Sequence, residues 1–269
     1  MKVAVIGGGT MGGAVVKGIL RARLAAKGDI IVSDVSRERR EIARKRYGVT
    51  VTADNAAATR DADAVILAVK PQEMDGVLDQ LSGHLASQLV ISIAAGVSLE
   101  TISRRLKYDV VVRAMPNTPA QVGRGMTVWT SSKELAAGMQ DMARLILASL
   151  GEEMYLKDER YLDMATAISG SGPAYVFLFM EALIDAGVHI GLPRDTAQKL
   201  VIETVAGSAE AMKKMARHPA ELKNMVTSPG GTTTEALFHL ESGGLRSLVI
   251  SAVLAAHEKA GRLGAKKDA

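Results

Sequence analysis

Cysteine is absent from this chain, and aromatic residues make up only 3% of its 269 positions. Without cysteine there is no disulfide, no thiolate metal ligand and no cysteine nucleophile. With a single tryptophan, the core has to be assembled from aliphatic residues and methionine, which dominate a hydrophobic fraction of 48%. That composition favours packed helices and a helix-covered parallel sheet over a β-sandwich.

An excess of one charge is also missing, since 33 basic and 29 acidic residues leave a formal net charge of +4. The densest basic stretch, residues 37–46, has the period of a solvated helix face rather than of a nucleic-acid site interleaved with aromatics. No continuously apolar stretch reaches the roughly 18 residues of a membrane span, and the N-terminus has no leader. We therefore expect a cytoplasmic protein with neither a nucleic-acid nor a membrane partner.

Metal chemistry is not indicated either. The five histidines are scattered and show no spacing typical of metal ligands. We expect no metal site.

The first half of the chain alternates short apolar runs with helical patterns. Short apolar strands separated by helices indicate βαβ units and a buried parallel sheet, here of the doubly wound Rossmann type. We expect strands at residues 2–6, 29–33, 64–69, 89–93, 110–113 and 126–129, and helices at residues 12–24 and 36–47.

The second half loses the period-2 alternation and becomes helical. Helical patterns cover residues 173–191, 194–217, 234–241 and 245–263. The sequence predicts a dinucleotide-binding α/β domain at residues 1–158 and an all-α domain at residues 159–269. Because the helices of the second half carry many small apolar residues, they favour a helical homodimer interface.

A glycine-rich turn joins the first strand to the first helix. Gly7, Gly9 and Gly12 have the spacing of a dinucleotide-binding turn, in which glycines permit the tight bend and the close approach of a pyrophosphate. The strand before it and the helix after it are the context that supports this interpretation. Because the N–H groups at the helix start attract phosphate, we predict that these glycines, Thr10 and Met11 contact a dinucleotide.

The end of the second strand bears on the choice of nucleotide. Asp34 is placed to bind the adenosine ribose hydroxyls, which favours NAD. Ser36, Arg37 and Arg39 follow at once and are suited to a 2′-phosphate, unless Ser36 only caps the helix and the arginines are solvated. NADPH and NADH both stay open as the cofactor.

Two further loops follow predicted strands, at the edge where open α/β sheets bind ligands. One contains Ala68, Val69, Lys70 and Pro71, and the other, residues 114–119, carries Asn117 between two prolines. Proline stiffens a loop, and stiff loops position ligands. We predict that both loops contact the cofactor.

Two turns of small residues precede helices in the second half: residues 169–175 and residues 228–234. Each presents backbone N–H groups at an expected helix N-terminus, which suits a carboxylate. Thr232 and Thr234 are expected to cap the second helix. The residues alone indicate a small anionic substrate beside a dinucleotide.

These motifs, in this order, resemble pyrroline-5-carboxylate reductase over essentially the whole chain. The resemblance rests on residues 7–12, 68–71, 92–97, 115–119, 169–175, 228–233 and 241–246. It implies a Rossmann domain followed by a helical domain that dimerises, often within a larger ring, and an oxidoreductase that makes L-proline from a cyclic imine in proline biosynthesis.

The resemblance also implies roles for particular residues. Asn55 and the loop at residues 68–71 should touch the cofactor. The substrate should be held by Ser228, Gly230, Gly231, Thr232, Thr233 and Ser171. Thr233 should face the imine nitrogen as the catalytic residue, while the proton comes from Thr233 or from water.

Three other functions are compatible with parts of the sequence. A β-hydroxyacid dehydrogenase shares the plan and the Gly-Ser-Gly turn, but it places a catalytic lysine where Val176 stands here. An imine reductase for a larger ring makes similar demands on the site. A nucleotide sensor without turnover needs only the first domain.

Overall fold

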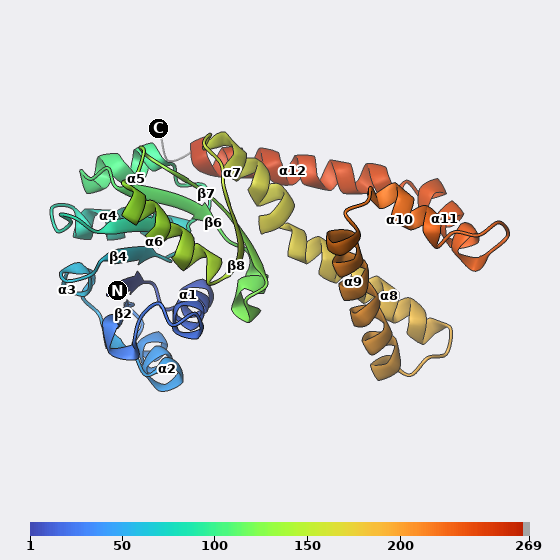
Figure 1. Cartoon of the computed structure of the whole chain (residues 1–269), viewed down its shortest axis with the longest axis horizontal. Helices are drawn as coiled ribbons and strands as arrows, with labels where there is room; N and C mark the ends of the chain where they lie inside the picture. Colours follow the sequence, from blue (N-terminus) through green and yellow to red (C-terminus); the bar gives the residue numbers. More distant parts are fainter. Residues whose placement is uncertain (266–269) are drawn as a thin grey trace. The chain divides into compact units, whose positions relative to one another are not determined.

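The structure is a computed structural model that describes residues 1–265. The described chain divides into two compact units (Figure 1). The first unit comprises residues 1–171 together with the end of the chain from Ala255, and the second unit is Gly172–Leu254.

An eight-stranded sheet organises the first unit, with the strand order β3-β2-β1-β4-β5-β6-β7-β8. All neighbouring strands are parallel except β6 and β7. The strands are β1 (Val3–Ile6), β2 (Ile30–Ser33), β3 (Thr50–Thr52), β4 (Ala64–Leu67), β5 (Leu89–Ser92), β6 (Val111–Met115), β7 (Gly125–Ser131) and β8 (Gly151–Tyr155). The predicted parallel, doubly wound sheet is confirmed.

Helices cover both faces of this sheet (Figure 1). The helical segments of the unit are α1 (Thr10–Arg21), η1 (Lys27–Asp29), α2 (Arg37–Tyr47), α3 (Asn55–Thr59), η2 (Pro71–Glu73), α4 (Met74–Leu81), α5 (Leu99–Leu106), η3 (Thr118–Val122), α6 (Ala137–Ala148), α7 (Arg160–Ala165) and the π turn η4 (Thr166–Gly170).

Two hydrophobic clusters form the core, one on each face. Along β1, Val3 and Val5 pack with α1, α2 and α6, while Ala4 and Ile6 pack with α3, α4 and α5. This period of two is the alternation of a strand that is buried on both faces. Each fully buried valine, leucine or isoleucine contributes about 1.5–3 kcal/mol, so this core fixes the strands whose ends carry the site.

The prediction missed β3 and β8, which are the two edges of the sheet. Edge strands need less apolar sequence, and β8 begins Gly-Glu-Glu while β3 is largely threonine. The antiparallel direction of β7 was also not foreseen. It follows from the short connection at residues 116–124, because a parallel crossover needs about a dozen residues or more.

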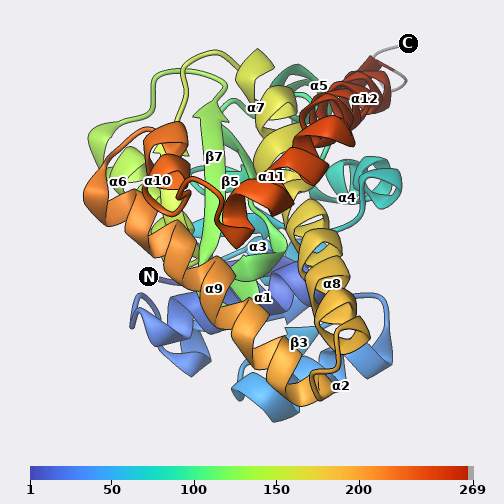
Figure 2. The ribbon, with the colours of Figure 1, turned by 90° about the vertical axis from the view of Figure 1, so that its right-hand side faces the viewer.

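The second unit consists of helices alone. They are α8 (Gly172–His189), α9 (Arg194–Met215), α10 (Pro219–Met225), α11 (Thr232–Ser242) and the first part, as far as Leu254, of α12 (Leu245–Ala265). Helices α8 and α9 pack as an antiparallel pair joined by a tight turn (Figure 2). The helical character predicted for this half is confirmed, although α10 was not expected.

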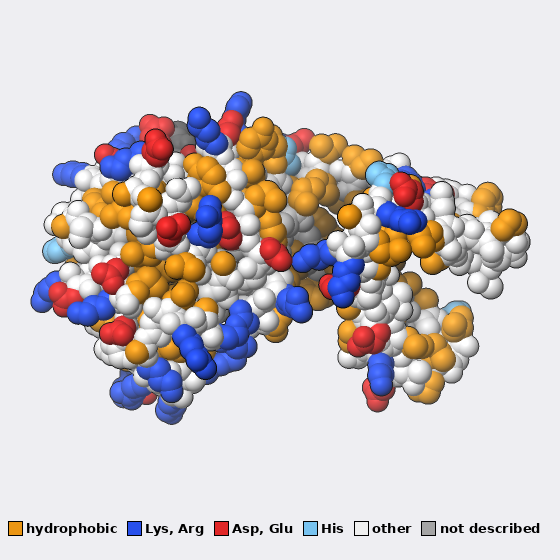
Figure 3. Space-filling view, in the orientation of Figure 1, with side chains coloured by type: hydrophobic (Ala, Val, Ile, Leu, Met, Phe, Trp, Pro, Cys, Tyr) orange, Lys and Arg blue, Asp and Glu red, His pale blue; other side chains and the backbone are white. Residues whose placement is uncertain are grey.

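Large apolar side chains on the helices of this unit are left in solvent. Phe177, Leu178 and Phe238 are between 61% and 68% exposed, and Figure 3 shows apolar side chains on the surface of these helices. One continuous helix, Arg160–His189, is long and apolar enough to cross a membrane, and α11 with α12 passes the same test as a bent pair. Exposed apolar surface of this extent marks a face that another surface covers.

The start of α8 differs from the sequence expectation. Residues 169–175 do not begin a helix, because α7, the π turn and α8 run on as one helix from Arg160 to His189. The N–H group of Ser171 donates to the carbonyl oxygen of Thr166 at 2.8 Å. Pro173 explains the distortion, since a proline inside a helix lacks an N–H group and its ring crowds the carbonyl of the residue four positions earlier.

Candidate dinucleotide and carboxylate sites

The glycine turn connects β1 to α1 in a way that requires glycine. Gly7 has a φ of +106°, and a Cβ on it would stand 2.7 Å from the carbonyl oxygen of Ala68. A Cβ on Gly12 would stand 1.9 Å from the carbonyl oxygen of Gly7, whereas a Cβ on Gly9 would meet nothing within 4 Å. Gly7 and Gly12 therefore serve packing, and Gly9 leaves open space at the start of α1.

That open space faces the N-terminus of α1. Gly9 is the N-cap of the helix and makes no side-chain cap. Within the described part of the chain, no hydrogen-bond partner is found for the N–H groups of Thr10 and Met11. First-turn N–H groups and the positive end of the helix dipole together suit a phosphate.

A hollow of about 480 Å³ lies at the carboxyl edge of the sheet, beside this turn. It brings together ten of the predicted cofactor residues: Gly7, Gly9, Thr10, Met11, Asp34, Asn55, Ala68, Val69, Lys70 and Pro71. These residues come from four separate stretches of the chain. Because β1, β2 and β4 are parallel and in register, the loops that follow these strands lie at the same edge of the sheet. The residues fit a dinucleotide, since the glycine cradle, the free N–H groups and an acidic residue share one hollow.

Asp34 is buried and held by the chain itself. Its Oδ2 accepts a 2.8 Å hydrogen bond from the Gly8 N–H and lies 3.5 Å from Nη1 of Arg39. Its Oδ1 accepts from the Ser36 N–H at 2.8 Å. The Asp34 carboxylate therefore links the glycine turn to the β2–α2 loop by hydrogen bonds. The guanidinium of Arg39 lies next to this carboxylate.

Asn55 is also buried, and both ends of its amide have partners. Its Oδ1 accepts from the Ser33 hydroxyl at 2.7 Å, and its Nδ2 donates to Oε1 of Gln80 at 2.8 Å. Asn55 thus joins β2 to α4 across the floor of the hollow.

Four predicted cofactor residues do not line this hollow. Gly12 packs against Gly7 and lines a different hollow, on the outer side of α1. Ser36 caps α2 by accepting from the Arg39 N–H, and Arg37 is exposed. Asn117 bonds the Met126 N–H and the Ser169 carbonyl instead.

Other lining residues were not assigned from the sequence. The sequence leaves open whether Arg37 or Arg39 meets a 2′-phosphate, and the structure places Arg39, and not Arg37, at the hollow. Val35 is 85% exposed there, which suits the flat apolar face of a base. The loop Ile93–Ala95 also contributes, and its place directly after a predicted strand is the signal that would have identified it.

In the second unit, the predicted carboxylate turn precedes α11. Gly230 has a φ of +68°, and the Gly231 N–H donates to the carbonyl of Ser228 at 3.0 Å. The Thr234 hydroxyl donates to the same carbonyl at 2.5 Å, so it braces the turn. The N-cap is Gly231, without a side-chain bond, and the expected capping by Thr232 and Thr234 is therefore wrong.

This geometry leaves N–H groups available at the start of α11. No partner is found for the N–H groups of Thr232 and Thr233 among residues 1–265. The Thr233 side chain is half-buried. Two free N–H groups at a helix N-terminus, next to a hydroxyl, suit a carboxylate and a neighbouring hydrogen-bond acceptor or donor.

Ser171 has a different setting from the one predicted. Its N–H is engaged with Thr166 inside the helix, so the proposed N-terminal carboxylate site at residues 169–175 is wrong in its geometry. A further motif, residues 241–246, forms the corner between α11 and α12. There the Arg246 guanidinium binds both carboxylate oxygens of Glu241 and holds the pKa of that carboxyl below its usual range.

The comparisons with known proteins match both units of the chain. The model for pyrroline-5-carboxylate reductase dimerisation matches residues 159–263, and a model for an NADP oxidoreductase, coenzyme F420-dependent, matches residues 2–96. The pyrroline-5-carboxylate reductase of Synechocystis sp. is 43% identical over 266 residues, covering 99% of each chain. The chain belongs to the pyrroline-5-carboxylate reductase family.

Further members of the family show the same extent of similarity. The pyrroline-5-carboxylate reductase of Corynebacterium melassecola is 40% identical and covers 97% of this chain and 98% of its own. The crystal structure of the Plasmodium falciparum pyrroline carboxylate reductase with NADP bound has a TM-score of 0.90 at 35% identity, covering 98% of both chains. The resemblance seen in the motifs is thus confirmed over both units.

Proposed function

We propose that this chain reduces pyrroline-5-carboxylate to L-proline with NADPH or NADH. The observation that carries the proposal is the dinucleotide hollow, in which the open face of Gly9 and the free first-turn N–H groups of α1 lie beside Asp34 and Asn55. Relatives that match the chain from end to end carry the name of this activity.

Residues of the first unit bind and orient the cofactor. The N–H groups of Thr10 and Met11 bind the pyrophosphate, while Asp34 and Arg39 meet the adenosine ribose or its phosphate. The loop Ala68–Pro71 and Asn55 complete the wall. When bound, NAD(P)H supplies the hydride, so the protein needs neither a nucleophile nor a metal for this reaction.

Residues of the second unit bind the substrate. The free N–H groups of Thr232 and Thr233, with the turn at Ser228, Gly230 and Gly231, hold the ring carboxylate. The Thr233 hydroxyl donates a hydrogen bond to the ring nitrogen. This bond stabilises the negative charge that develops on the nitrogen as the neutral imine accepts the hydride. The main contribution to rate is the fixed orientation of the two reactants.

The chain acts as a homo-oligomer. The dimerisation model covers residues 159–263, the region whose helices leave phenylalanines and leucines in solvent. We assign that apolar surface, including the long helix Arg160–His189, to a second copy of the chain rather than to a membrane. We further propose that the dimers assemble into a ring. We also propose that the protein is cytoplasmic and has no nucleic-acid partner.

The functional division of the chain is residues 1–158 for the dinucleotide and residues 159–269 for substrate and dimer. The start of the dimerisation model at residue 159 supports this boundary. The compact units change at residue 171 instead, because α7 and the π turn pack with the sheet. The boundary between the compact units therefore differs from the proposed boundary between the two functions.

The test is the oxidation of NADPH and of NADH with pyrroline-5-carboxylate, alongside its six-membered homologue. We expect rapid loss of the reduced nucleotide with the five-membered ring and formation of proline. Faster turnover of the six-membered ring would identify a different imine reductase. Folded protein that oxidises neither nucleotide with either ring would contradict the proposal and favour a sensor or a hydroxyacid dehydrogenase.

A further inference from the structure

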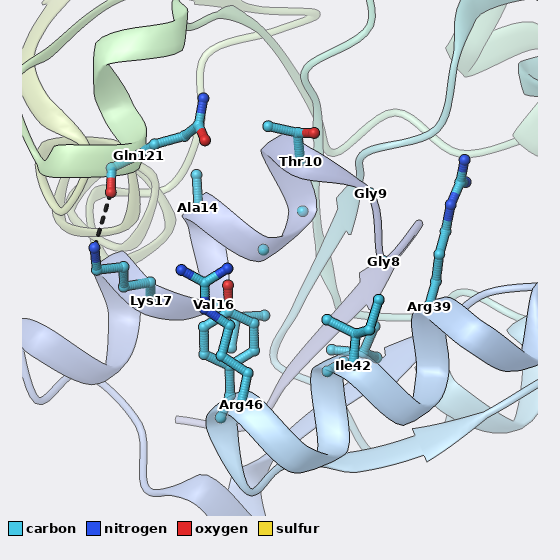
Figure 4. Close-up of a pocket in the computed structure, with 15 residues that line it drawn as sticks. Gly8, Gly9, Thr10, Ala14, Val16, Lys17, Arg39, Ile42, Arg46 and Gln121 are labelled. Carbon is cyan, nitrogen blue, oxygen red and sulfur yellow. Dashed lines mark hydrogen bonds between the residues drawn. The ribbon is translucent and has the colours of Figure 1, made fainter.

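A second hollow, of about 340 Å³, lies between α1 and α2 on the outer side of the glycine turn (Figure 4). It shares Gly9, Thr10 and Arg39 with the dinucleotide hollow, and then extends along α1 as far as Lys17 and along α2 as far as Tyr47. Its size falls within the range of about 300–1,000 Å³ that is usual for small-molecule sites. The proposed reductase activity uses none of its remaining lining.

The charged side chains that line this groove are all positive. Lys17, Arg39 and Arg46 line it, and no aspartate or glutamate is among its lining residues within the described chain. Figure 3 shows lysine and arginine side chains gathered along the lower edge of the first unit, where α2 lies in Figure 1. Like charges held around one hollow raise the local concentration of anions.

The three cations differ in how far they are already engaged. Lys17 donates to the Gln121 carbonyl at 3.0 Å, and Arg39 is 3.5 Å from the Asp34 carboxylate. Arg46 has no ion pair in residues 1–265, and its guanidinium carbon lies 5.6 Å from the centroid of the Tyr47 ring. Arg46 is thus the cation of the groove that is free to take an anionic ligand.

The walls between these cations are apolar. Ile42 is 50% exposed although it faces the groove, and Ala14, Val16 and Tyr47 continue the same wall. Gly13 permits this packing, because a Cβ there would lie 2.9 Å from the Tyr47 hydroxyl. A bare inorganic ion would leave Ile42 and the ring of Tyr47 in water, whereas a ligand with a flat apolar body would cover them.

We propose that the groove between α1 and α2 binds a nucleotide-like ligand, a phosphate group attached to an apolar body, at a site distinct from the dinucleotide hollow. Arg46 and Lys17 bind the phosphate, and Ile42 and Tyr47 pack against the body. This inference does not depend on the reductase activity.

The experiment is a calorimetric titration of ADP into the full chain with NADP⁺ held at saturation, so that the dinucleotide hollow is filled. We expect binding of one ADP per chain, and weaker binding of inorganic phosphate, which lacks the apolar body. Arg46→Gln should weaken ADP binding about tenfold or more, because it removes a charge-assisted hydrogen bond. Ile42→Ala should weaken ADP but leave phosphate binding unchanged.

Lys45→Gln is the matched control, since Lys45 lies on the same exposed helix and is not among the lining residues. If Arg46→Gln and Lys45→Gln weaken binding equally, the anions are held only by general surface charge and the proposal is overturned. It is also overturned if ADP binds only when NADP⁺ is absent, because ADP then occupies the dinucleotide hollow. These readouts are independent of imine reduction, so failure of the enzyme assay is distinguishable from failure of the groove.

Discussion

The side-chain amide of Asn117 donates a 2.9 Å hydrogen bond to the carbonyl oxygen of Ser169. Four residues after Ser169 stands Pro173, which has no N–H group to offer that carbonyl. The loop after β6 thus supplies a donor at the point where the long helix is distorted into a π turn. The other end of the amide accepts from the Met126 N–H at 2.9 Å, so Asn117 joins three segments of the first unit.

We predict that Asn117→Ala lowers the free energy of unfolding by about 1–3 kcal/mol, because it leaves a part-buried carbonyl and a part-buried N–H group without these partners. Urea denaturation measures this. Asn117→Asp, which keeps an acceptor for Met126 but no donor for Ser169, should lose part of the same stability. The affinity for NADP⁺ should stay within about twofold. A fall in nucleotide affinity at unchanged stability would instead support the cofactor contact expected from the sequence.

The second and third glycines of the turn, Gly9 and Gly12, should respond differently to alanine. Gly9→Ala should fold normally, since its Cβ meets nothing within 4 Å, but should weaken NADP⁺ binding by about tenfold or more, because the methyl group occupies the phosphate approach. Gly12→Ala should destabilise the protein itself, since its Cβ would lie 1.9 Å from the Gly7 carbonyl oxygen. Thermal unfolding and calorimetry separate the two effects. Equal nucleotide affinity in Gly9→Ala and the native chain would show that the pyrophosphate does not bind at this turn.

Thr233→Ala should reduce turnover of pyrroline-5-carboxylate by about tenfold to a hundredfold, the cost of one hydrogen bond to a charged group. Its effect on NADP⁺ affinity should be small, because Thr233 is on α11 and the dinucleotide residues are on the first unit. Steady-state kinetics and nucleotide titration test both points. Thr233→Ser should restore most of the activity, and unchanged turnover in Thr233→Ala would exclude this hydroxyl from the mechanism.

Tyr108 makes stability depend on pH in the alkaline range. Partial burial raises the pKa of its hydroxyl above the ordinary value of 10.0, and the hydroxyl donates to the Gln88 carbonyl at 2.6 Å. The unfolded chain therefore loses this proton first as the pH rises. The contribution of Tyr108 is complete below pH 10 and declines as the pH rises through the folded pKa, by at most about 1.4 kcal/mol per pH unit.

Unfolding free energies measured from about pH 9 to pH 11 will show this decline. Tyr108→Phe lacks both the hydroxyl and its proton, so its stability should fall less steeply over that interval. Identical slopes for the native chain and Tyr108→Phe would show that other groups account for the alkaline loss.

Much of the fold followed from local pattern. The apolar runs at β1, β2, β4 and β5 predicted their strands to within two residues at each end, because strands buried on both faces must be apolar throughout. The edge strands β3 and β8 carry threonine and glutamate, which leave no such pattern. Residues 169–175 look like a helix start because small residues and a proline usually mark one, yet here they lie inside a helix.

The candidate site divides in the same way. The glycine spacing, the acidic residue after β2 and the position of loops after strands identified most of the dinucleotide hollow, since these features depend on neighbours in the chain. The role of Asn117 depends on Ser169 and Met126, which follow it by 52 and 9 residues. No periodicity encodes such contacts.

By itself, the sequence determined the parallel sheet, the helical second half, the family and the glycine turn predicted to bind a dinucleotide, because each depends on local patterns and motifs that can be found in the chain one segment at a time. Only the tertiary structure decided which cation faces the hollow, that Asn117 supports the π turn, and that a basic groove lies between α1 and α2. The physical reason is that a side chain's partner is set by where the packed elements bring it, and packing is a property of the whole fold.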